Sequence, residues 1–144
     1  MTFDPENTVI KLCSQGMMSE GLGQVEEAKA LFEKAWTEAD TDFEKFIAAH
    51  YLARIQRDTN GKLRWDETAL EMALKIDSVS IKAYYPSLYL NIGKCHEDLN
   101  AFDRARMNYD QAFTNLEFLP EDGYGKMIRA GVLAARERIQ SQTK

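Results

Sequence analysis

Small residues recur at a nearly fixed interval along this chain of 144 residues. The first series, with spacings of about 37, 40 and 38 residues, is Gly16, Ala53, Gly93 and Gly131. The second series, with spacings of about 38 and 39 residues, is Ala35, Ala73 and Ala112. A small side chain lets two helices approach closely, so each position indicates a helix crossing. Two series that share one period and one phase predict a repeated helical hairpin.

Between the breaks in the sequence, apolar residues return every three to four positions, which is the spacing of helices. The pattern shows no strand of alternating apolar and polar residues and predicts helices at 6–20, 24–38, 42–58, 64–76, 82–98, 102–117 and 123–140. Asp42 and Asp122 are expected to accept hydrogen bonds from free N–H groups where helices begin. Gly23 and Gly61 are expected in the tight turns of hairpins.

One hairpin cannot cover its own apolar face, so hairpins of this kind stack on one another. We expect repeats at about 6–40, 42–78 and 82–118, followed by a capping helix at about 123–140. The predicted fold class is all-α, a right-handed α-solenoid of three helix-turn-helix hairpins plus a C-terminal capping helix. Residues 1–144 are expected to form a single domain.

The hairpins resemble the tetratricopeptide repeat family. The first hairpin has the family's series of small, turn and aromatic residues at Leu12, Gly16, Gly23, Ala28, Phe32 and Ala35. The third has it at Tyr89, Ile92, Gly93, Asn100, Ala101, Phe102, Ala105, Tyr109 and Ala112. The second departs from the pattern, with Asp66 where the family has alanine, and the period is longer than the usual 34 residues.

The composition disfavours several kinds of partner. A net charge of −5 argues against nucleic acid, which is bound through an excess of Lys and Arg. The first residues lack the basic start and apolar run of a signal peptide, and no apolar stretch approaches the ~18 residues of a membrane span. We therefore expect a cytoplasmic protein with no membrane partner, whose two distant cysteines stay reduced.

No pattern in the sequence indicates an enzyme. The Gly21-Leu22-Gly23 and Gly123-Tyr124-Gly125 fragments follow no predicted strand, as a nucleotide-binding loop would require. Cys13 and His50 occupy equivalent positions in adjacent hairpins, but two ligands are too few for a zinc site. We expect no catalytic residue, no metal and no cofactor.

The family resemblance implies that the first helices line a concave groove in which a peptide from another protein binds. Transferring the family's phase gives these groove candidates: Ile10, Cys13, Met17, Ile47, His50, Arg54, Arg57, Leu90, Lys94, Ile128 and Val132. The ends of this groove are apolar and its middle is basic, which favours an acidic or amphipathic partner segment. The alternative is that Arg54 and Arg57 pair with Glu20 or Glu97 across the groove.

The leading functional hypothesis is therefore a protein interaction module or adaptor. One alternative is a self-associating structural protein, a homodimer that pairs through Ile128, Val132 and Ile139 of the last helix. Another is a non-catalytic subunit or helper of an enzyme encoded elsewhere.

Overall fold

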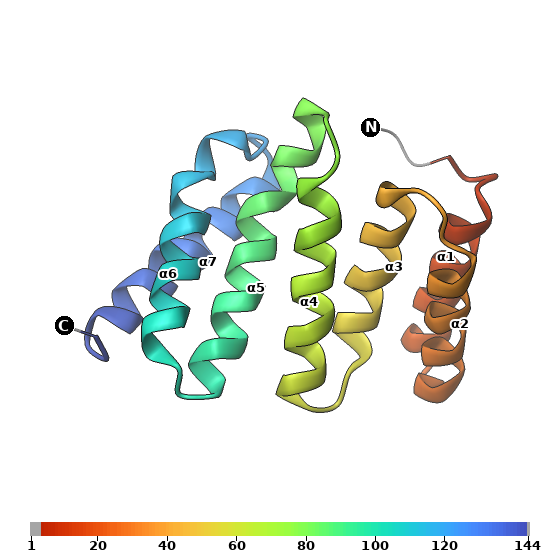
Figure 1. Ribbon diagram of the computed structural model, residues 1–144, viewed down its shortest axis with the longest axis horizontal. Coiled ribbons are helices and arrows are strands. Elements are labelled where there is room, and N and C mark those ends of the chain that lie inside the picture. The colour runs from red at the N-terminus through yellow and green to blue at the C-terminus, as the bar shows by residue number, and fades with distance from the viewer. Residues whose placement is uncertain (1–3, 144) are drawn as a thin grey trace. The chain divides into compact units, whose positions relative to one another are not determined.

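The computed structural model describes residues 4–143, which form seven α-helices, two 3-10 turns and no strand (Figure 1). The elements are α1 (Thr8–Gly21), α2 (Val25–Glu38), α3 (Asp42–Ile55), α4 (Thr59–Leu74), η1 (Val79–Tyr84), α5 (Tyr85–Asp98), α6 (Phe102–Thr114), η2 (Leu116–Phe118) and α7 (Gly123–Gln140). The predicted all-α class is confirmed. None of the helices described is long and apolar enough to cross a membrane.

The chain divides into two compact units, Met1–Ile76 and Asp77–Lys144. In the N-terminal unit, α1 pairs with α2 and α3 pairs with α4, and α3 packs against both α1 and α2. In the C-terminal unit, α5 pairs with α6, and α7 packs against both. The predicted hairpins and closing helix are thus all present within the units. The single domain over residues 1–144 and the right-handed stacking stay predictions.

The helices begin at polar caps. The Asn7 side chain accepts hydrogen bonds from the N–H groups of Val9 and Ile10, and Asp122 caps α7 as predicted, accepting from Gly125 N–H at 2.8 Å. The cap of α3 differs from the prediction, because Thr41 takes that position and Asp42 is the first helical residue. Thr41 forms a capping box with Glu44, which satisfies two N–H groups at once and outcompetes a cap at Asp42.

The turns of the first and third hairpins share one backbone conformation. Gly23 has a φ of 80° and Asn100 a φ of 61°, both in the left-handed region, which confirms Gly23 as the turn glycine. The prediction for Gly61 was wrong, because α4 begins at Thr59 and Gly61 lies in its first turn. The Asp58 side chain accepts from Gly61 N–H and starts this helix about five residues earlier than predicted.

In each of these two hairpins, an aromatic ring of the second helix packs over a glycine of the first helix. A Cβ at Gly93 would lie 2.5 Å from Tyr109 Cε1, and a Cβ at Gly16 would collide with the Phe32 ring. Both rings are fully buried. These two members of the first series are therefore helix crossings, as predicted. Gly131 differs, since a Cβ there would meet only Leu90 Cδ2, at 3.3 Å.

We predict that Gly93→Ala destabilises the fold by about 1–3 kcal/mol, because the added methyl would overpack the fully buried Tyr109 ring, 2.5 Å from Cε1. Chemical denaturation would measure this change in the free energy of unfolding. The control is Gly21→Ala near the end of α1, where a Cβ meets nothing within 4 Å. Equal stability of the two variants would contradict the assignment of Gly93 as a crossing.

Candidate functional site

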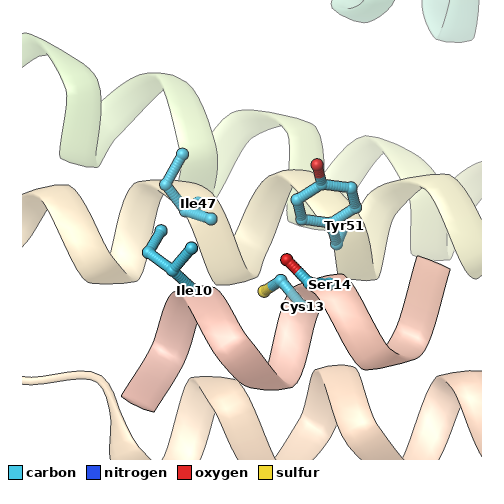
Figure 2. Close-up of a pocket in the computed structure, with 5 residues that line it drawn as sticks. All are labelled: Ile10, Cys13, Ser14, Ile47 and Tyr51. Carbon is cyan, nitrogen blue, oxygen red and sulfur yellow. The ribbon is translucent and has the colours of Figure 1, made fainter. Parts of the chain in front are cut away.

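A cavity of about 160 Å³ opens between α1 and α3 in the N-terminal unit (Figure 2). Its lining consists of Ile10, Cys13, Ser14, Ile47 and Tyr51. Ile10, Cys13 and Ile47 were groove candidates from the sequence, and the structure brings them together. Ser14 and Tyr51 were missed, although each lies one helical turn after a candidate isoleucine, and residues four apart share a helix face.

The cavity has an apolar wall that its surroundings hold in place. Cys13 is only 2% exposed, and burial raises the pKa of its thiol to about 12, so the thiol stays protonated at neutral pH. The Tyr51 ring stacks on Phe32, with centroids 5.3 Å apart and planes inclined by 19°. Tyr51 is thereby tied to the ring that closes the first hairpin. A neutral, aliphatic and aromatic lining of this kind suits an apolar side chain.

His50 lies beside this cavity on α3 and is half-buried, with its ring against the edge of Tyr51 at 5.2 Å. Burial, and then the charges of Arg54 and Lys62, lower its pKa below the ordinary 6.5. The imidazole is therefore neutral at pH 7. Within residues 4–143, no three His, Cys, Asp or Glu side chains gather as a metal site would require.

The predicted basic centre of the groove is paired. Arg54 lies 3.3 Å from Glu20, which confirms the alternative interpretation for this arginine. Arg57 lies beyond the end of α3, and its guanidinium pairs with Glu26 of α2 at 2.6 Å rather than with Glu20 or Glu97.

Lys94 of α5 likewise forms an ion pair, with Asp98 at 2.8 Å. All three predicted cations thus have a carboxylate neighbour. The exposure of these side chains makes the pairs weak and exchangeable, because surface ion pairs contribute about 0–1 kcal/mol each.

The remaining candidates differ in exposure. Met17, one turn after Cys13, is 41% exposed. In the C-terminal unit, Leu90 and Ile128 are half-buried against a core cluster in which Val132 is fully buried. Val132 and Ile128 therefore lie on the side of α7 that packs against its own unit, not on an open groove wall. The sequence did not distinguish these faces because both carry apolar residues.

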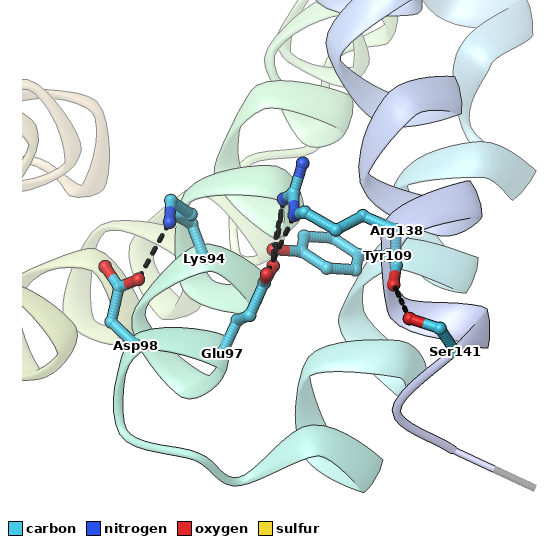
Figure 3. A network of polar contacts seen from close by, with 6 residues as sticks. All are labelled: Lys94, Glu97, Asp98, Tyr109, Arg138 and Ser141. Atoms are coloured by element: carbon cyan, nitrogen blue, oxygen red, sulfur yellow. Dashed lines mark hydrogen bonds and ion pairs between the residues drawn. The ribbon is translucent and has the colours of Figure 1, made fainter.

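Glu97 of α5 joins three helices of the C-terminal unit (Figure 3). It accepts hydrogen bonds from Arg138 Nε at 2.7 Å and Nη2 at 2.9 Å, and from the Tyr109 hydroxyl at 2.6 Å. The hydrogen bond from Arg138, more than the one from Tyr109, lowers the pKa of Glu97 from 4.5 to about 2. Burial and the carboxylate raise the pKa of Tyr109 above its ordinary value. This network holds α7 on the α5–α6 hairpin.

Because the folded pKa of Glu97 lies below its unfolded value, its contribution to stability is complete above pH 4.5 and is lost as the pH falls toward 2. We expect a loss of at most about 3 kcal/mol across this interval. Denaturation curves of the parent and of Glu97→Gln between pH 7 and 2 would measure it. The stability difference between the two proteins should shrink through this interval, and a constant difference would contradict the assignment.

Residues 86–114 match the family model of the tetratricopeptide repeat, and this range is the α5–α6 hairpin with its glycine and tyrosine crossing. Comparison with curated proteins and with solved structures gave no match. Tetratricopeptide repeats are in general non-catalytic protein interaction modules. The α5–α6 hairpin therefore matches a tetratricopeptide repeat, and the α1–α2 hairpin shares its glycine–ring contact.

Proposed function

We propose that this protein is a non-catalytic adaptor that binds a peptide segment of a partner protein on the α1–α3 face of its N-terminal unit. The proposal rests on the cavity between these helices, because predicted groove residues from both helices line it. The cavity has room for one apolar side chain of the peptide. Its neutral walls exclude a charged one, since burying an unpaired charge is costly.

The same helix faces also offer polar contacts next to the cavity. Arg54 follows Tyr51 by three residues and Glu20 follows Met17 by three, so each lies one turn further along its helix face. The Arg54 side chain is 53% exposed, and its pair with Glu20 can be exchanged for a carboxylate of the peptide. The site therefore suits an amphipathic segment with an apolar anchor near an acidic residue.

Burial weighs against one alternative function. Self-association was predicted through Ile128, Val132 and Ile139, but Val132 and Ile139 are fully buried in the C-terminal unit. That face cannot pair with a second copy without opening the unit. A helper of an enzyme encoded elsewhere stays compatible with the proposal, because such a helper would also bind its enzyme as a protein partner.

We predict that Ser14→Phe weakens partner binding by at least tenfold, because the ring would occupy the cavity from its exposed rim. The partner is first recovered by affinity capture and mass spectrometry, and overlapping peptides of it are then titrated by fluorescence anisotropy. The matched control is Gln15→Phe, at an exposed neighbour on α1 outside the cavity lining. If both variants bind the recovered peptide as tightly as the parent, the cavity is not the binding site.

A further inference from the structure

The register of the repeats places α7 as the first helix of a hairpin. Gly131 belongs to the series of Gly16 and Gly93. Met127 lies four residues before Gly131, as Leu12 does before Gly16. Ala134 lies three residues after Gly131, as Ser19 and His96 do after their glycines. The face of α7 that holds Met127 and Ala134 is therefore equivalent to the hairpin face of α1, and Ala130, one residue before Gly131, corresponds to the buried Ile92 of α5.

In α1 and α5, a second helix of similar sequence covers this face. Leu12, Gly16 and Ser19 are buried in the pair with α2, and Ile92, Gly93 and His96 are buried in α5, which pairs with α6. The covering helices bury the same series, alanine, an aromatic residue four positions later and alanine three positions after that. These residues are Ala28, Phe32 and Ala35 in α2, and Ala105, Tyr109 and Ala112 in α6.

On α7 the equivalent face lies open. Met127 is 62% exposed, and Ala130 and Ala134 are exposed as well. Among the described residues, no aromatic ring covers Gly131, whose nearest neighbour for a Cβ is Leu90. The helix instead packs on its own unit through Val132, Ala135 and Ile139. A face of apolar and small residues, of the kind that a second helix covers in α1 and α5, is thus exposed on α7.

The charges of α7 indicate the charge of its partner. Of the four cations on α7, Arg136 pairs with Asp110 and Arg138 with Glu97 inside the unit, which leaves Lys126 and Arg129 to act on a partner, against one carboxylate of the helix, Glu137. Lys126 and Arg129 are exposed beside the open face. A helix that approaches this face is favoured when acidic residues border its apolar side. In α2, the helix that covers α1, four glutamates outnumber two lysines.

We propose that the open face of α7 is a docking surface for an acidic amphipathic helix of a partner protein. The apolar side of that helix carries alanine, an aromatic residue four positions on, and alanine three positions further, so that the ring lies over Gly131. The partner thereby completes a fourth hairpin. This surface is separate from the α1–α3 cavity, so either proposal can fail without the other.

A peptide with the sequence of residues 24–39 and blocked ends is a defined probe for this surface. It contains the Ala28, Phe32 and Ala35 series and an excess of glutamate, and a fluorescein on its blocked N-terminus reports binding by fluorescence anisotropy. We expect saturable binding of this peptide to the intact protein. The double variant Met127→Glu with Ala134→Glu should weaken binding at least tenfold, because it places two carboxylates on the open face.

Two controls test the specificity of this binding. Met107→Glu with Gln111→Glu adds the same charges to an exposed face of α6 and should leave peptide binding unchanged. A peptide with Phe32→Ala should bind at least tenfold more weakly to the parent, without any change to the protein. Circular dichroism of both double variants should give the parent's thermal midpoint within a few degrees.

Three results would overturn the proposal. One is the absence of peptide binding to the parent, or binding that the α7 double variant leaves unchanged. Another is a concentration-dependent dimer of the parent, seen by sedimentation, that this variant abolishes, since the occupant would then be a second copy. The third is parent binding to phosphatidylserine vesicles that the same variant abolishes, because the face would then be a membrane contact.

Discussion

The glycine beneath an aromatic ring is the contact on which both units depend. At Gly16 and Gly93 the missing Cβ is the space that Phe32 and Tyr109 occupy. Helices brought this close bury alanines on either side of the ring. The packing of the hairpins therefore requires glycine at these positions, whatever family the sequence resembles.

The same contact organises the polar chemistry around it. Because its ring is fixed over Gly93, Tyr109 directs its hydroxyl to Glu97 at 2.6 Å, and Glu97 binds the guanidinium of Arg138 on α7. A carboxylate that is 15% exposed and held by three donors contributes more than the exposed pairs of Arg57 or Lys94. In the N-terminal unit, Phe32 instead supports Tyr51, which forms part of the cavity wall. The same type of helix crossing thus helps to hold α7 in the C-terminal unit and supports the cavity wall in the N-terminal unit.

The two proposed binding surfaces follow from incomplete packing. The α1–α3 cavity is a small gap between two first helices, whereas the open face of α7 is a whole hairpin surface without its second helix. The first suits a side chain of an extended or amphipathic segment, and the second suits a helix.

The sequence alone determined the helices, the hairpin pairing and the crossings at Gly16 and Gly93, because periodicity, turn residues and close packing follow from residues near one another in the chain. The sequence pattern did not decide between neighbouring cap residues. In the structure Thr41 caps α3 in place of Asp42, and Asp58 caps α4 at an earlier start than predicted. Only the tertiary structure decided which apolar face of α7 is buried, and which carboxylates neutralise Arg54 and Arg57. The physical reason is that both depend on the distance between side chains on different helices or turns. The apolar pattern of one helix does not specify which part of the chain packs against each of its faces.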